Sequence, residues 1–155
     1  MKGDSKVIAY LNQILANELT AINQYFLHSR MYRNWGYASL AEHEYKESID
    51  EMKHADQLIE RILFLDGLPN LQKLNKLLIG ETPKEVISCD LKLEEIAIPD
   101  LRDAIAYCES VRDYGTRELL EAILVSEEEH VDWLETQLSL INSLGEALYL
   151  QDKIS

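Results

Sequence analysis

The sequence contains few of the residues that interrupt helices or crosslink small proteins: six glycines, three prolines and two cysteines in 155 residues. Cys89 and Cys108 form neither a Cys-x-x-Cys pair nor a zinc-binding pattern, and a helix between them would hold them about 28 Å apart. An internal disulfide is therefore excluded. Two reduced thiols are typical of a reducing compartment.

Positive charge is also scarce, with 15 Lys and Arg against 28 Asp and Glu, for a net charge of −13. Nucleic-acid binding needs Lys and Arg grouped on one face, so this class of partner is excluded. Cations are the natural partners of such a chain. Solubility explains an acidic balance equally well, so the charge only supports the evidence below.

Long hydrophobic runs are missing. No apolar stretch approaches the roughly 20 residues of a membrane span, and the first ten residues lack the basic and apolar regions of a signal peptide. We therefore predict a cytoplasmic protein with no membrane association. A length of 155 residues with 46% hydrophobic content predicts a single domain over residues 1–155.

Alternation with period two and Asn-Gly hairpin signals are absent too, so no strand is expected. The pattern predicts an all-α bundle of four long helices at about 4–34, 38–65, 82–111 and 114–144, with a short amphipathic tail helix at about 146–153. Expected helix starts are Asp4 or Ser5, a capping box at 39–42 and another at 82–85. Expected stops are Gly36, Gly67 followed by Pro69, and Gly145.

The segment 66–81 is the longest predicted connection. Its 16 residues can extend across about 50 Å, and each helix is about 45 Å long, so the segment can run the height of the bundle as a crossover. The second and third helices are then parallel. Pro99 predicts a kink in the third helix. Two separate helices are the alternative, but the apolar register through Ile98, Leu101 and Ile105 favours one bent helix.

One polar pattern occurs twice. The motif Glu-x-x-His appears at 51–54 and at 127–130, 76 residues apart, and each copy follows an earlier glutamate by 33 residues. This predicts a duplicated helical hairpin. All six polar residues fall on predicted core faces near the middle of their helices, so a bundle brings them to one height. They are Glu18, Glu51, His54, Glu94, Glu127 and His130.

Four buried carboxylates require compensating cations, because burial of an isolated charge costs several kcal/mol. Two divalent ions would balance four carboxylates, and imidazoles would complete each coordination sphere. A single glutamate on an acidic helix is usually a solvated charge, but the repeated pattern favours a metal site. Mixed carboxylate and imidazole ligation suits iron or manganese better than zinc or calcium, and we favour iron.

Two aromatic residues are predicted beside this site. Tyr25 lies seven residues after Glu18 on the same face, and Trp133 lies three after His130. Either ring could supply an electron to the metals, and Tyr25 is included among the candidate catalytic residues. Core packing explains both positions equally well.

With these residues the chain resembles bacterioferritin over nearly its whole length, including the stretches 17–25, 110–114 and 130–136. The resemblance implies a ferroxidase that oxidises Fe²⁺ with oxygen or peroxide at an intrasubunit di-iron centre. It also implies storage of ferric mineral in a hollow shell of 24 subunits, built from dimers, and a ferredoxin-type reductant for release. Glu18 and Glu94 would be terminal ligands, Glu51 and Glu127 would bridge, and His54 and His130 would each bind one iron.

The same resemblance implies haem b shared between two subunits, with Met52 as axial ligand. Independently, Met52 lies about 100° around the helix from Glu51 and joins Tyr45 and Ile49 in an apolar stripe outside the core. Leu19 and Phe26 form a similar stripe on the first helix. Such a face should be buried against a partner, with or without haem.

Two positions depart from the family pattern. Leu58 stands where many members have a tyrosine, which argues against radical chemistry at that position. Lys46 stands where some members have an iron-binding histidine, so an inner-surface iron relay is not expected even though Asp50 remains.

Two other functions fit the six residues. One is a different di-metal enzyme, either a peroxide reductase or a manganese catalase, but the paired Cys-x-x-Cys motifs of a rubredoxin-like domain are absent. The other is a helical scaffold in which the metal is purely structural.

Overall fold

The computed structural model describes residues 1–155 and contains five α-helices and no strand. The all-α prediction is confirmed, and each predicted boundary lies within two residues of the observed one. The third helix continues through Pro99, so the alternative of two separate helices is wrong. The helices are α1 (Ser5–Trp35), α2 (Ala38–Phe64), α3 (Pro83–Ser110), α4 (Tyr114–Leu144) and α5 (Glu146–Gln151).

Most of the predicted helix ends are observed. The Asp4 carboxylate accepts hydrogen bonds from the backbone N–H groups of Lys6 and Val7 at 2.8 and 3.1 Å. Thr82 caps α3 by accepting from the N–H of Glu85 at 3.2 Å. Gly36 ends α1 with φ of 92°, a left-handed conformation that glycine adopts without steric cost.

The predicted capping box at 39–42 is wrong. Helix α2 begins one residue earlier, at Ala38, and its N-cap Tyr37 makes no side-chain capping bond. The backbone N–H of Ser39 donates instead to the carbonyl of Lys153, at 3.1 Å. The C-terminal tail thus supplies the acceptor that a capping side chain would have provided, because α5 folds back onto this end of the bundle.

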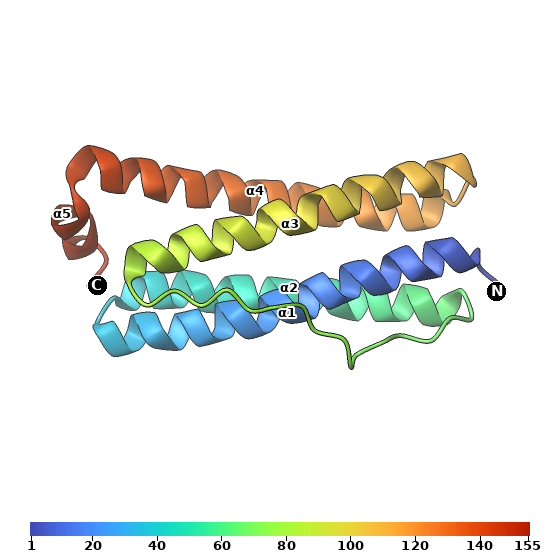
Figure 1. The fold of residues 1–155 in the computed structure, drawn as a ribbon, viewed down its shortest axis with the longest axis horizontal. Helices are drawn as coiled ribbons and strands as arrows, with labels where there is room; N and C mark the ends of the chain where they lie inside the picture. Colours follow the sequence, from blue (N-terminus) through green and yellow to red (C-terminus); the bar gives the residue numbers. More distant parts are fainter.

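Figure 1 shows α1 beside α2 and α3 beside α4, each pair antiparallel and joined by a short turn. The segment between α2 and α3 runs back along the bundle, so α2 and α3 are parallel as predicted. The short α5 lies across the end of the bundle where α4 finishes. None of the helices combines the length and the apolar character needed to cross a membrane.

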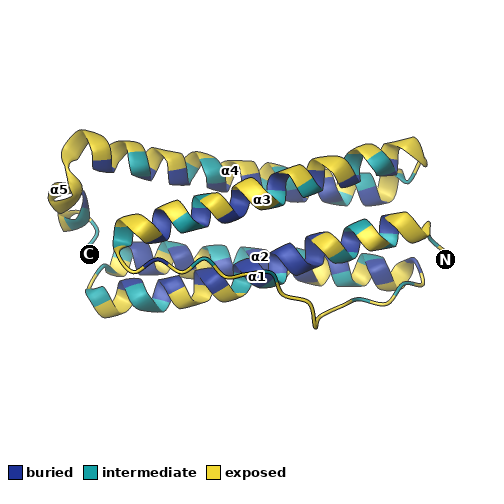
Figure 2. Ribbon diagram, in the orientation of Figure 1, coloured by how far each residue is buried: buried dark blue, intermediate teal, exposed yellow.

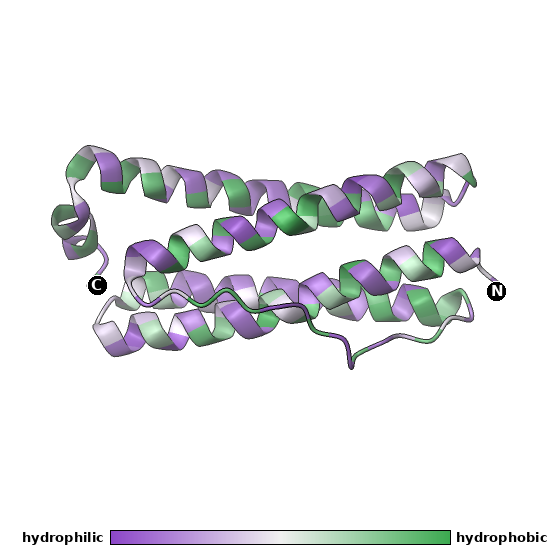
Figure 3. Ribbon diagram, viewed as in Figure 1, coloured by the Kyte–Doolittle hydropathy of each residue, from purple (hydrophilic) through white to green (hydrophobic).

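The apolar core is divided along the bundle axis. One cluster of 13 buried residues extends from Val7 to Ile123, and a cluster of eight lies toward α5, around Tyr32 and Tyr149. Buried residues line the inner faces of the long helices in Figure 2, and hydrophilic residues recur along the same helices in Figure 3. The polar side chains between the two clusters include the six predicted metal ligands, and all of these except His54 are buried.

Candidate metal centre

All four long helices contribute to one buried polar centre. Of the six predicted residues, the four glutamates and His130 are at most 3% exposed, and the side chain of His54 is 13% exposed. Glu18, Glu51, His54 and Glu127 can each place one ligand atom within 4.8 Å of the others, and so can Glu94, Glu127 and His130. Because Glu127 belongs to both groups, the two groups form a single site.

The two histidines occupy different parts of this centre. His54 Nδ1 lies 3.2 Å from Glu127 Oε1 and 3.6 Å from carboxylate oxygens of Glu18 and Glu51. His130 Nδ1 lies 3.3 Å from Glu94 Oε1. Each Glu-x-x-His motif places both side chains on the same helix face, since residues three apart are neighbours there.

The nitrogen and oxygen atoms of these side chains could hold metal ions. Buried polar atoms nearly always have hydrogen-bond partners. Here five of the six candidate residues carry a buried nitrogen or oxygen with no partner. These atoms are Glu18 Oε2, His54 Nδ1, Glu94 Oε2, Glu127 Oε1 and His130 Nε2. Such a concentration of unpaired donor atoms indicates a site built to bind cations.

Burial and mutual repulsion hold protons on the metal-free carboxyls. Desolvation, with the charge of Glu127, raises the pKa of Glu94 to about 8. Desolvation, with the charge of Glu51, raises the pKa of Glu127 to about 7. Desolvation also raises the pKa of Glu51. Bound cations would remove the repulsion that favours these neutral forms.

The imidazoles are shifted in the same direction for a different reason. Burial acts to lower the pKa of His54, but the adjacent carboxylates of Glu127 and Glu51 outweigh burial and raise the value to about 10. Burial likewise opposes protonation of His130, but Glu94 raises its pKa to about 9. Carboxyls and imidazoles titrate together here, so the metal-free centre shares protons between them at neutral pH, and a metal ion would have to displace these protons.

The two predicted aromatic residues differ in their relation to the centre. Tyr25 is fully buried, donates a short hydrogen bond to Glu94, and lies edge-on to the His130 ring at 5.1 Å. Trp133 stacks on His43 with ring centroids 3.6 Å apart. Tyr25 therefore touches the candidate ligands directly, whereas the closest ring to Trp133 is that of His43.

Met52 lies outside the centre, as its helical angle predicted. It is 52% exposed. Phe26 and Tyr45, which belong to the predicted apolar stripes of α1 and α2, are also exposed, and their ring centroids lie 6.4 Å apart. The guanidinium of Arg30 covers both rings, at 4.7 and 5.1 Å from their centroids. Of the two departures from the family pattern, Leu58 is buried in the core and Lys46 is exposed.

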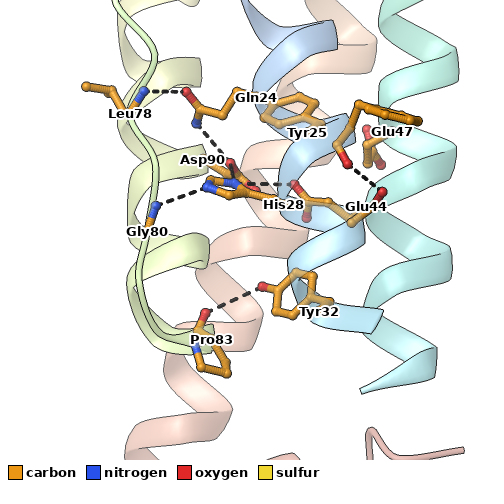
Figure 4. Close-up of polar contacts among 12 residues, drawn as sticks. Gln24, Tyr25, His28, Tyr32, Glu44, Glu47, Leu78, Gly80, Pro83 and Asp90 are labelled. Atoms are coloured by element: carbon orange, nitrogen blue, oxygen red, sulfur yellow. Dashed lines mark hydrogen bonds and ion pairs between the residues drawn. The ribbon is translucent and has the colours of Figure 1, made fainter. Parts of the chain in front are cut away.

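The sequence pattern did not identify a second buried polar cluster, formed by His28, Glu44 and Asp90 (Figure 4). A helical signal was present, since Asp90 precedes Glu94 by four residues and Glu44 precedes Glu51 by seven. The cluster has no counterpart in the 76-residue repeat, because the positions 76 residues after His28 and Glu44 are the apolar Ala104 and Leu120. The repeated spacing therefore predicts the six candidate ligands and not this cluster.

The fold and the buried carboxylate and imidazole centre define a ferritin-like protein, and residues 8–144 match the family model described as "Ferritin-like domain". The chain is 49% identical to a bacterioferritin of Mycobacterium bovis, covering 100% of this chain and 98% of the relative. It is 52% identical to a bacterioferritin of Rhodobacter capsulatus (94% and 90% covered) and 48% identical to one of Brucella melitensis (97% and 94% covered). The chain belongs to the bacterioferritin family.

Proposed function

We propose that this protein stores iron and oxidises Fe²⁺ to Fe³⁺ at the buried centre. The observation that carries the proposal is the convergence of unpaired ligand atoms from both halves of the chain, with Glu127 common to the two groups. The relatives' names favour iron storage over a peroxide reductase or a manganese catalase.

In this proposal each half of the chain supplies a terminal carboxylate and one imidazole. Glu18 and Glu94 bind terminally, and His54 and His130 bind one iron each. Glu51 and Glu127 bridge, and the membership of Glu127 in both groups supports its assignment. Glu51 belongs to the first group only, so its bridging role rests on the resemblance alone.

The chemistry is a two-electron oxidation of two Fe²⁺ ions. Each ion loses one electron, and dioxygen takes up the two electrons with two protons to give hydrogen peroxide, or peroxide is reduced to two hydroxide ions. Binding of Fe²⁺ displaces protons from the centre, since the raised pKa values of His54 and His130 and of the facing carboxyls keep the metal-free centre protonated. In this proposal Tyr25 orients Glu94 and acts as an electron donor, and its hydrogen bond to Glu94 supports the first of these roles.

The whole chain, residues 1–155, is one domain of a cytoplasmic homo-oligomer in which dimers build a shell of 24 subunits around ferric mineral. Haem b binds between two subunits through Met52, whose exposure within an apolar stripe supports burial against a partner. A ferredoxin-type protein would reduce the stored iron.

Aerobic addition of Fe²⁺ to the purified protein should produce ferric absorbance. A double variant, Glu18→Ala with Glu127→Ala, should slow it at least about 100-fold, because two carboxylates of one metal position are lost. Absorbance spectroscopy with stopped-flow mixing measures the rate.

The control removes two exposed glutamates that neighbour candidate ligands on α3 and α4, Glu95→Ala with Glu129→Ala. This variant should oxidise iron at the wild-type rate. Equal rates in all three proteins, or no ferric absorbance in the wild type, would contradict the proposed ferroxidase function.

A further inference from the structure

The cluster of His28, Glu44 and Asp90 has the composition of a third metal-binding group. The three side chains come from α1, α2 and α3 and are at most 1% exposed. Their ligand atoms lie within 4.8 Å of one another. Glu44 Oε1 and Asp90 Oδ2 lack a conventional hydrogen-bond donor. Composition and burial alone would therefore favour a cation here.

Backbone contacts to His28 argue against a metal. The N–H of Gly80 donates to Nε2 at 3.0 Å, so this nitrogen is an acceptor and carries no proton. The proton of the ring is then on Nδ1, which donates to Asp90 Oδ1 at 2.8 Å. Both nitrogens are occupied, and neither has a lone pair free for a metal ion.

A neutral His28 leaves two buried carboxyl groups facing each other without a cation between them. No Lys or Arg forms an ion pair with Glu44 or Asp90. Two adjacent buried carboxyl groups do not both ionise, so the pair retains one proton. That proton supplies the donor that the two unpaired oxygens otherwise lack.

The hydrogen bonds show which group carries the proton. Asp90 Oδ1 accepts from Gln24 Nε2 at 2.9 Å as well as from His28, and both bonds favour an ionised Asp90. Glu44 accepts no such bond. Consistently, burial raises the pKa of Glu44 well above its ordinary value. Burial opposes ionisation of Asp90 as well, but hydrogen bonds from Glu44 and His28 leave its pKa lowered.

We propose that Glu44 is a neutral carboxylic acid that donates to ionised Asp90, and that this one-proton pair is a positioning device for the crossover segment, not a third metal site. Asp90 orients Gln24 and His28 so that each presents an acceptor to the crossover (Figure 4). Gln24 Oε1 accepts from the N–H of Leu78 at 2.8 Å, and His28 Nε2 accepts from that of Gly80.

Thr20 extends this row of acceptors by receiving the N–H of Asn75 at 2.9 Å. Thr20, Gln24 and His28 are four residues apart and so lie along one face of α1. The pair also lies next to the metal centre, because Tyr25 follows Gln24 and Asp90 is one turn before Glu94. The device therefore holds the crossover where α1 and α3 present Tyr25 and Glu94 to each other.

The device has a defined pH dependence. The titratable groups near Glu44 are His28 and Tyr32 of α1, Glu47 of α2 and Asp90 of α3, and His130 of α4 interacts with Asp90. None is a Lys or Arg that could stabilise an ionised Glu44. Because the pKa of Glu44 is raised in the folded protein, the stabilisation by the Glu44–Asp90 pair is complete below the ordinary glutamate pKa. This stabilisation is lost as the pH rises through the raised pKa of Glu44.

Two variants in the zinc-loaded, assembled protein test the proposal. Glu44→Gln keeps a donor to Asp90 but cannot ionise, whereas Glu44→Ala removes the donor. Infrared spectra at neutral pH should show the carbonyl stretch of a neutral carboxylic acid in the wild type that is absent from Glu44→Gln. Zinc loading ionises the carboxyls of the metal centre, so they do not contribute to this band.

Hydrogen exchange of residues 75–80, read by mass spectrometry, measures the crossover. Protection should be retained in Glu44→Gln and reduced about tenfold in Glu44→Ala, since removal of the donor leaves a buried oxygen of Asp90 without a hydrogen-bond partner. Wild-type protection, corrected for intrinsic exchange, should fall at alkaline pH, whereas that of Glu44→Gln should not.

Three results would overturn the proposal: an infrared band unchanged in Glu44→Gln, crossover exchange in Glu44→Gln as fast as in Glu44→Ala, or anomalous zinc density among His28, Glu44 and Asp90 in crystals. None of these measurements depends on iron oxidation. Failure of this proposal is therefore distinguishable from failure of the proposed ferroxidase function.

Discussion

At the residue scale, identical side chains acquire different chemistry from their surroundings. Glu44 and Glu127 are both fully buried glutamates on a bundle face. Glu127 faces His54 and other carboxylates with an unpaired oxygen, which suits a metal ion. Glu44 faces an Asp90 that two donors keep ionised, which suits a proton. The distinction depends on the neighbours and not on the residue type.

The raised pKa values at the centre predict how the metal-free protein responds to pH. Folded-state values of about 10 for His54, 9 for His130 and 8 for Glu94 exceed the ordinary values of 6.5, 6.5 and 4.5. Folding therefore takes up protons, so stability should fall as pH rises from about 5 toward 10. Denaturant midpoints measured in a chelator at several pH values test this expectation.

The zinc-loaded protein should differ from the metal-free protein in how its stability depends on pH. Metal binding replaces the protons, so it should remove the alkaline loss of stability and acidify a weakly buffered solution at neutral pH. The variant lacking Glu18 and Glu127 should release fewer protons. A metal-free protein whose stability increases between neutral and alkaline pH would contradict the assignment of protons to the metal-free centre.

At the scale of the helices, the sequence predicted a helix N-cap correctly where the capping side chain and the N–H group it binds belong to the same segment. Thr82 and Asp4 cap α3 and α1 as their positions predict. The box at 39–42 failed because the acceptor for Ser39 comes from Lys153, more than 100 residues away. The parallel arrangement of α2 and α3 was predictable, because the length of the crossover limits its path.

This contrast predicts different effects for two similar substitutions. Thr82→Ala removes the bond to the N–H of Glu85 and should destabilise the protein by about 1 kcal/mol per subunit. Ser39→Ala should be nearly neutral, because its hydroxyl makes no capping bond and the bond from its N–H is retained. Guanidinium unfolding at fixed protein concentration measures both.

At the scale of the whole molecule, the exposed apolar residues are the feature that a single chain leaves unexplained. Met52, Phe26 and Tyr45 present apolar surface away from the core. Further exposed apolar residues lie on the crossover, among them Leu68, Leu71 and Leu74. Burial of such surface against other subunits is the natural consequence, in keeping with the proposed shell.

The proposed haem site gives the corresponding prediction. Protein expressed with adequate haem should show a Soret band, and Met52→Leu should lose or shift it, because leucine cannot ligate iron. Met31→Leu, a substitution of a partly buried methionine on α1, is the matched control and should leave the band unchanged. A wild type without a Soret band, or an unchanged band in Met52→Leu, would contradict the bis-methionine proposal.

Assembly is tested separately by mass. Under native conditions the wild type should form a particle of about 24 subunits, and Met52→Leu should retain it, because leucine preserves the apolar character of the stripe. Analytical ultracentrifugation distinguishes this particle from smaller species. A wild type found only as a monomer or dimer would refute the shell.

The sequence by itself determined the helical class, the crossover and the inward orientation of the six candidate ligands. Helical periodicity and a duplicated spacing are local properties, and a core face is recognisable before the chain folds. Only the tertiary structure decided that Glu127 joins both ligand groups and that the N–H of Gly80 occupies His28. These contacts join segments far apart in the chain, and the chemistry of a buried polar group depends on the partner that folding places beside it.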